Sequence, residues 1–168
     1  MDGRYAILAV VLLGALLISG CTEPHDREAE VVMDSTNRWL GTEQGKNQFP
    51  GGVAGEPIRI WRGGEVLYWI AAIKNQDGLY IGNLIVTQED FTSPKQIVEY
   101  KEPKERILNY TQSEAYQQII LENPDYPAWQ IERPILVSVE GDGLYWYSKV
   151  KSGGQVIDEL YLETFTMF

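Results

Sequence analysis

The sequence predicts an α+β fold of two tandem units, each a helix followed by an antiparallel meander, behind an N-terminal lipoprotein signal peptide. Three observations predict this fold. Apolar residues change twice from helical spacing to alternation, the stretch Leu67-Tyr68-Trp69 returns as Leu144-Tyr145-Trp146, and a short apolar run precedes the only cysteine. A unit of roughly 60 to 70 residues has a thin core, so we expect both units to pack into one body.

Residues 1–20 have the pattern of a signal peptide. The apolar run 6–18 is short for a bilayer-spanning helix, and it leads into Ile18-Ser19-Gly20-Cys21, the form of a lipobox. We expect cleavage before Cys21, lipidation of its sulfur and a tether over residues 21–27. An uncleaved signal anchor is the alternative. Either topology places the rest of the chain at the extracytoplasmic face of the membrane, because Arg4 precedes the apolar run and stays inside.

The first unit, residues 28–100, should begin with a helix that Asp26 caps and Gly41 ends. Residues 41–55 are expected to form a glycine-rich loop. Alternating apolar residues then predict strands at 57–62, 66–74 and 79–87, with a fourth strand at 96–100. The apolar stripe of the helix consists of Ala29, Val32, Met33, Thr36, Trp39 and Leu40.

Residues 49–74 match the residues 77 positions later at eight of 26 ungapped positions, which indicates an internal duplication. After a connector at 101–110, the second unit covers residues 111–168. Its helix starts with the capping box of Thr111 and Glu114 and stops at Pro124. The stripe of this helix is Ala115, Tyr116, Ile119 and Ile120. Strands are predicted at 130–139, 144–151 and 155–164.

The second unit resembles the PepSY module, through Ser113-Glu114-Ala115-Tyr116 opening a helix and the three successive strands after it. The resemblance covers about 50 residues in each half. It implies a small helix-plus-meander fold with a cystatin-like outline. It also implies a place outside the membrane, in lipoproteins, sensor ectodomains or peptidase propeptides. The function it implies is binding or restraint of peptidases or other envelope proteins.

Side chains alternate along a strand, so each predicted sheet has a face toward its helix and a face away from it. The helix-facing sets are predicted to be Leu67, Trp69, Ala71 and Ile73 in the first unit and Leu144, Trp146, Ser148 and Val150 in the second. The sets facing away are Tyr68, Ile70, Ala72 and Lys74, and Tyr145, Tyr147, Lys149 and Lys151, to which neighbouring strands add Ile81, Ile85, Ile157 and Tyr161.

The faces that point away from the helices are more apolar than a solvated face needs to be. Either the two sheets bury these faces against each other, or the faces form an open platform for a peptide or polymer. For the second case the candidate binding residues are tyrosines, because each combines a flat apolar ring with a hydroxyl. These candidates are Tyr68, Tyr145, Tyr147 and Tyr161.

The composition argues against several functions. A net charge of −10 disfavours nucleic acid as a partner, and one thiol allows no internal disulfide. The only histidine, His25, lies in the tether, so we expect no catalytic triad, metal site or cofactor. Paired carboxylates at Glu89-Asp90 and at Glu140 and Asp142 leave a glycosidase open, although turn chemistry explains the pair of Glu140 and Asp142.

Asn109-Tyr110-Thr111 has the form of a glycosylation acceptor, although Thr111 is also explained as a helix cap. The sequence as a whole predicts a lipid-anchored, non-enzymatic protein. It would be held at the membrane by the lipid on Cys21 and would bind an envelope protein or peptide. The alternatives are a structural accessory subunit of a membrane complex and a peptidase inhibitor or assembly factor.

Overall fold

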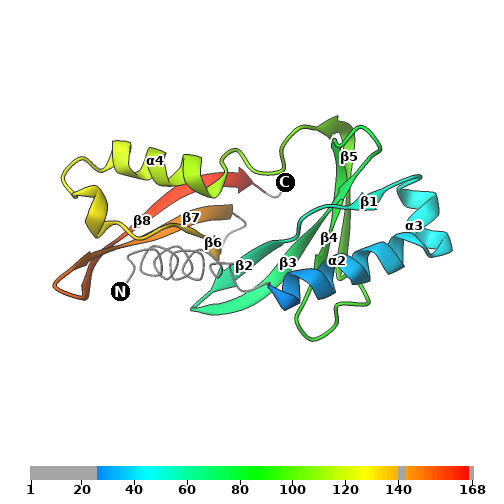
Figure 1. Ribbon diagram of the computed structural model, residues 1–168, viewed down its shortest axis with the longest axis horizontal. Helices are drawn as coiled ribbons and strands as arrows, with labels where there is room; N and C mark the ends of the chain where they lie inside the picture. The colour runs from blue at the N-terminus through cyan, green and yellow to red at the C-terminus, as the bar shows by residue number, and fades with distance from the viewer. Residues whose placement is uncertain (1–25, 140–142, 167–168) are drawn as a thin grey trace, which may run out of the picture.

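The computed structural model describes residues 26–139 and 143–166, which form an elongated α+β body (Figure 1). Several predicted features lie outside these residues: the signal peptide, Cys21, His25 and the pair Glu140 and Asp142. None of the described helices is both long and apolar enough to cross a membrane. We call residues 26–104 the first half and the described residues from 111 onward the second half.

The first half begins with α2 (Arg27–Leu40), whose start and end agree with the prediction. The carboxylate of Asp26 accepts a hydrogen bond from the Ala29 amide at 3.3 Å, and Gly41 follows the last residue. Four of the six predicted stripe residues are buried. These are Val32, Thr36, Trp39 and Leu40.

The predicted loop at 41–55 is wrong, because it contains the helix α3 (Glu43–Gln48) and the short strand β1 (Val53–Ala54). The Thr42 hydroxyl accepts a hydrogen bond from the Gly45 amide at 3.1 Å and so caps α3. A Cβ at Gly45 would lie 2.3 Å from the Trp39 carbonyl oxygen. Gly45 therefore permits two helices to approach closely, whereas the sequence pattern had indicated a loop.

The four predicted strands of the first half are present as β2 (Ile58–Arg62), β3 (Glu65–Lys74), β4 (Tyr80–Val86) and β5 (Gln96–Lys104). They pair antiparallel in sequence order. Tight turns join the first three, with positive φ angles of +59° and +88° at Gly63 and Gly64. β5 is longer than predicted, so the connector begins after Lys104.

The second half begins with α4 (Gln112–Glu122), and its capping box is formed as predicted: Thr111 and Glu114 each bond the other's backbone. The three strands are β6 (Ile135–Val139), β7 (Gly143–Ser152) and β8 (Gln155–Thr166). The first of them was predicted to begin at residue 130. It starts later because Ala128–Gln130 form a 3-10 helix and Pro134 has no amide proton for a ladder.

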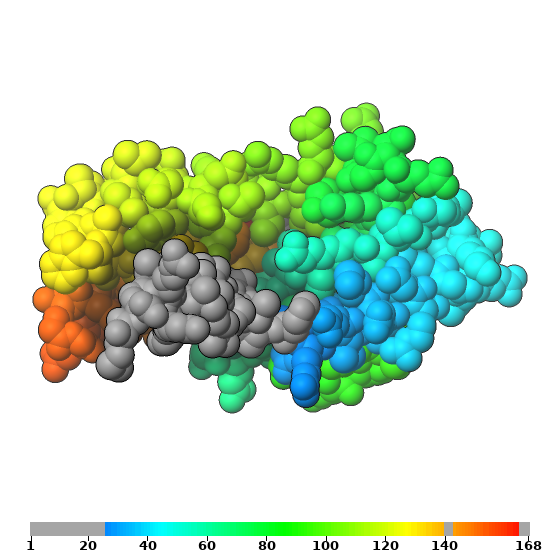
Figure 2. Space-filling view, in the orientation of Figure 1, coloured from blue at the N-terminus to red at the C-terminus, as the bar shows by residue number. Residues whose placement is uncertain are grey.

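All eight strands belong to one sheet in the order β5-β4-β3-β2-β6-β7-β8, with β1 beside β3. The two halves join where β2 and β6 run parallel, and Trp61 and Val137 form the only residue pair of this ladder. Figure 2 shows the halves side by side along the long axis of the molecule. Of the two alternatives for the faces that point away from the helices, stacking of two sheets face to face is not what the structure has: the halves meet edge to edge in one sheet.

The two long helices cover opposite faces of this sheet. α2 packs on the side of Trp69, Ala71 and Ile73, and α4 packs on the side of Leu144, Trp146 and Val150. Because Trp61 and Val137 pair, their neighbours Ile60 and Leu136 point to the same side, and both lie in the core beneath α4. The second-half core therefore continues into the first half.

Several side chains in the first half differ from the sequence prediction in burial or in the face that they occupy. Ile70 and Ala72 point away from α2 as predicted, but both are buried. Ile81 packs against the core beneath α2, because the register shifts between Tyr80 and Gly82. Leu67 falls at the register shift opposite Ile60 and Trp61, and it is 37% exposed where the prediction had placed it in the core.

Candidate functional site

The face of the second half opposite α4 carries a groove of about 620 Å³, which we name the tyrosine groove. Tyr147 of β7 and Tyr161 of β8 form one wall, and the turn between β2 and β3 forms another. The groove is lined by Trp61, Arg62, Gly63, Gly64, Glu132, Arg133, Ile135, Val137, Ser138, Val139, Tyr147, Lys149, Glu159 and Tyr161.

Strand register brings the tyrosines together. Tyr147 pairs with Tyr161 across β7 and β8, and with Ile135 across β6 and β7. Residues that pair across strands point to the same face of a sheet. The Tyr147 and Tyr161 rings lie 5.1 Å apart between centroids, and Tyr145 meets Tyr161 edge to face at 6.4 Å. Three of the four tyrosines selected from the sequence therefore form one cluster.

Glu159 organises the hydroxyl groups of this cluster. The Tyr147 hydroxyl donates to Glu159 Oε1 at 2.7 Å, and the Tyr161 hydroxyl donates to Oε2 at 3.3 Å. Burial and the neighbouring Glu159 carboxylate raise the pKa of both tyrosines above the ordinary value. Both phenols therefore stay protonated at neutral pH and act as hydrogen-bond donors.

The apolar part of this face is open to solvent. Ile135 is 38% exposed, Val139 40% and Tyr161 50%, and Ile157 beside them is also exposed. No described helix or strand covers these residues. An exposed apolar patch of this kind is typical of a binding surface.

Tyr68, the fourth predicted tyrosine, is not part of the cluster. It is half-buried on the α4 side of the sheet, where it packs against the core of the second half. Burial raises its pKa, and the Ser138 side chain is its hydrogen-bond partner. Tyr68 thus faces away from α2 as predicted, but the junction of the halves turns that direction into the interior.

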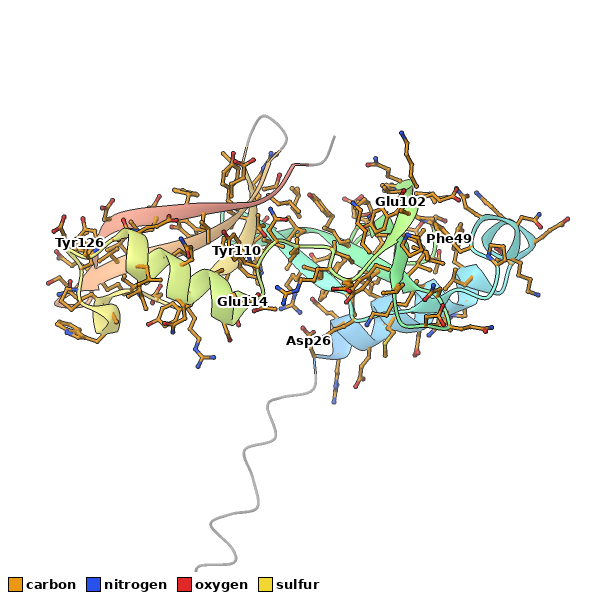
Figure 3. The ribbon with its side chains drawn as sticks, turned by 90° about the horizontal axis from the view of Figure 1, so that it is seen from above. Asp26, Phe49, Glu102, Tyr110, Glu114 and Tyr126 are labelled. Atoms are coloured by element: carbon orange, nitrogen blue, oxygen red, sulfur yellow. The ribbon has the colours of Figure 1, made fainter. Side chains whose placement is uncertain are left out.

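A second hollow, about 630 Å³, lies where the halves meet, and we name it the junction cleft. It opens because β2 and β6 diverge before their single pair. Figure 3 places Asp26 and Glu114, near the starts of α2 and α4, toward the middle of the molecule. The cleft is lined by Asp26, Ala29, Glu56, Pro57, Ile58, Arg59, Trp61, Trp69, Tyr80, Leu108, Thr111, Gln112, Ile135, Leu136 and Trp146.

Arg59 is the only arginine or lysine in the lining of the junction cleft. Its guanidinium carbon lies 4.5 Å from the ring centroid of Trp69 and 5.4 Å from that of Trp61. Its Nη2 atom donates to Asp26 at 2.5 Å and to Glu28 at 3.5 Å. Arg59 was not among the residues selected from the sequence. The only available signal was an arginine between Ile58 and Ile60, on a strand that also ends with an arginine, Arg62.

Within 26–139 and 143–166, no three His, Cys, Asp or Glu side chains are grouped to hold a metal ion. Of the Glu89-Asp90 pair, Asp90 caps a turn, accepting from the Thr92 hydroxyl at 2.6 Å and amide at 2.8 Å. These hydrogen bonds lower the pKa of Asp90 to about 2. Asp90 therefore remains a carboxylate at neutral pH.

Asn109 is exposed, and its amide donates to the Thr164 carbonyl at 3.3 Å, beside the end of β8. Thr111 accepts from the Glu114 amide at 3.3 Å as the cap of α4. The cap explanation for Thr111 is thus confirmed, and the exposure of Asn109 leaves room for a sugar there.

Comparison of the chain with family models, with curated proteins and with solved structures found no match. The resemblance to PepSY modules therefore stays a prediction.

Proposed function

We propose that this protein is a lipid-anchored, non-enzymatic binding protein that takes an extended segment of an envelope protein or peptide in the tyrosine groove. The observation that carries the proposal is the open apolar face of β6, β7 and β8. Tyr145, Tyr147 and Tyr161 offer ring faces on this face, and the hydroxyl oxygens of Tyr147 and Tyr161, whose protons are donated to Glu159, remain as acceptors. Rigid aromatic side chains of this kind supply contact area at a low entropic cost.

The anchor is part of the proposal. Asp26 follows Cys21 by five residues, so a fully extended tether spans at most about 18 Å. The folded part of the chain would then lie close to the extracytoplasmic membrane surface.

Cys21→Ala tests the anchor, because the variant has no sulfur to carry the lipid. The variant should leave the membrane fraction. A Cys21→Ala protein that still sediments quantitatively with membranes at mature length would contradict lipid anchoring.

We further propose that the two halves are tandem copies of one unit, residues 28–100 and 111–168. Ile58 and Ile135 open β2 and β6 at a distance of 77 residues, and Arg62 and Val139 end them at the same distance. The parallel pairing of β2 and β6 supports the duplication. Two copies related by a two-fold axis parallel to these strands would have parallel strands at the axis and would place α2 and α4 on opposite faces of the sheet, as observed. Arg59 in one copy and Leu136 in the other make the pair asymmetric.

The experiment that tests binding is crosslinking in cells followed by mass spectrometry. The variant carries Tyr147→Lys and Tyr161→Lys, and Trp129→Lys is the matched control because Trp129 is 78% exposed outside the groove. We expect one partner to be crosslinked in wild type and in the control and to be lost in the double variant. Scattered neighbours in all three would support a structural accessory subunit instead.

The resemblance to PepSY modules supports a narrower form of the proposal, in which the partner is a peptidase that the protein restrains or helps to assemble. The purified chain should then inhibit an envelope peptidase, and the Tyr147→Lys, Tyr161→Lys variant should inhibit it less. A partner without peptidase activity would remove this narrower form and leave the binding function in place.

A further inference from the structure

The sheet has a gap beyond the single pair that joins its halves. β2 is paired along its other side to β3, and β6 to β7, but among the described residues only Trp61 and Val137 form a ladder pair between β2 and β6. The N-terminal ends of both strands, at Ile58 and Ile135, therefore present edges to the junction cleft. A strand edge without a neighbour can pair with another extended backbone.

Three buried hydrogen-bond donors belong to residues that line this cleft. They are Arg59 Nε, Trp69 Nε1 and Trp146 Nε1, and none has an acceptor in the part of the chain that the structure describes. Trp69 is 1% exposed and Trp146 6%. Buried donors are nearly always satisfied in folded proteins, so three at one cleft point to acceptors that a ligand supplies.

The cleft continues the tyrosine groove. Trp61 and Ile135 line both hollows, on the same face of the sheet. A chain that lies along the groove and passes these two residues enters the space between β2 and β6.

We propose that the segment held in the tyrosine groove runs on past Trp61 and inserts its end into the junction cleft. There its backbone carbonyls accept hydrogen bonds from Arg59, Trp69 and Trp146. This inference rests on the proposed function, because one segment occupies both hollows. An apolar side chain suits the insertion, since Ile58, Leu136 and Leu108 form much of the wall.

The charges at the cleft favour a neutral acceptor over an anion. Asp26 and Glu28 already bind the Arg59 guanidinium, and Glu56 adds a further carboxylate to the lining. A free carboxylate would meet this negative charge, whereas an amide carbonyl accepts from the same donors without it. The part of the segment that enters the cleft therefore has no free terminal carboxylate: it is either an internal stretch of the partner chain or a capped end.

The test uses the purified full chain in detergent and a synthetic bead library of hexapeptides capped at both ends. The affinity of the best peptide is then measured for wild type and for variants with unchanged thermal unfolding. Trp146→Phe removes one donor, whereas Arg59→Met removes the whole guanidinium group with its contacts to Asp26 and Glu28, and both changes keep most of the side-chain volume. Trp129→Phe is the matched control, because it removes an indole N–H outside both hollows.

We expect each cleft variant to raise the dissociation constant about three- to tenfold, as for one lost hydrogen bond, and Trp129→Phe to leave it unchanged. N-methylation of the inserted residues should abolish binding, because it blocks strand pairing. In wild type, the peptide should move the indole N–H signals of Trp69 and Trp146 downfield in NMR spectra, which tests the contact without any substitution.

The outcomes separate this inference from the proposed function. Binding that is lost in the Tyr147→Lys, Tyr161→Lys variant but unchanged in both cleft variants, with unmoved Trp69 and Trp146 signals, would overturn insertion and leave the groove function standing. A library without a binder, or a best peptide that the tyrosine variant binds like wild type, would overturn both.

Discussion

Glu159 links the hydroxyl groups of Tyr147 and Tyr161 in the tyrosine groove, although it was not among the residues selected from the sequence. Its two carboxylate oxygens accept from Tyr147 and Tyr161 and fix both rings relative to one another. A pre-ordered pair of rings loses less entropy on binding than two independent side chains. The carboxylate also holds both phenols in the protonated form.

Glu159→Gln should lower the pKa of Tyr147 and of Tyr161 toward the ordinary value of a tyrosine. Burial raises both values first, and the negative charge of Glu159 raises them further, so removal of the charge lowers them only in part. NMR titration of the tyrosine ring carbons measures this. Tyr100, whose pKa is raised to about 12 by burial and nearby Tyr80, is an internal control that should not change. If the pKa of Tyr147 and the pKa of Tyr161 were the same in Glu159→Gln as in wild type, the role of Glu159 would be contradicted.

Alternation along each strand was enough to predict the helix-facing residues of β7 and to place Tyr145, Tyr147 and Tyr161 on one face of the sheet. Tyr68 was assigned by the same rule, and its direction relative to α2 is correct. The rule could not say what covers the far side of β3. That depends on how the halves join, which a two-residue period does not encode.

At the scale of elements, the caps were readable because a side chain and an amide a few positions away satisfy each other locally. Asp26 and the Thr111–Glu114 box are examples. The α3 helix was missed because its N-cap, Thr42, lacks a capping box: Gly45 stands three positions later, where the box has Glu or Gln. The register shifts in β3 and β4 were missed as well, because a bulge shows itself only through the partner strand.

Gly45→Ala should destabilise the packing of α3 against the end of α2. The added methyl group would lie 2.3 Å from the Trp39 carbonyl oxygen and 2.7 Å from the Leu40 Cα, so backbone has to move. We expect a loss of about 1–3 kcal/mol in the free energy of unfolding, measured with urea.

Gly41→Ala is the matched control, because its nearest neighbour would be the Arg38 carbonyl at 3.2 Å and its φ angle of −73° suits alanine. Its effect should be clearly smaller. A Gly45→Ala protein as stable as wild type would show that α3 does not need this close approach.

At the scale of the whole molecule, one residue pair between β2 and β6 joins two halves that also share a core. Ile60 and Ile70 of the first half pack with Leu136 and Trp146 of the second beneath α4. No sequence pattern marks this junction, because it depends on one ladder position and on the direction in which β2 and β6 meet. The junction cleft arises from the same geometry and was equally hidden from the sequence.

Ile60→Ala should therefore destabilise both halves together. Ile60 is fully buried, and the truncation should cost about 2–5 kcal/mol in the free energy of unfolding. Urea unfolding should remain a single transition, with the amides of α2 and α4 losing hydrogen-exchange protection in parallel. Val53→Ala, at a half-exposed strand position, is the control with an expected effect within about 0.5 kcal/mol. Separate transitions for α2 and α4 would contradict a shared core.

The measurement that tests the central claim most directly is photocrosslinking in cells from inside the tyrosine groove. A photoreactive phenylalanine replaces Tyr161 in the anchored chain, and the same group at Trp129 is the reference position on the exposed surface. We expect a crosslink from position 161 to one envelope protein. This crosslink should not form from position 129, and its yield should fall when Tyr147→Lys is added. The same crosslinks from both positions, or none from position 161, would contradict a binding function for the groove.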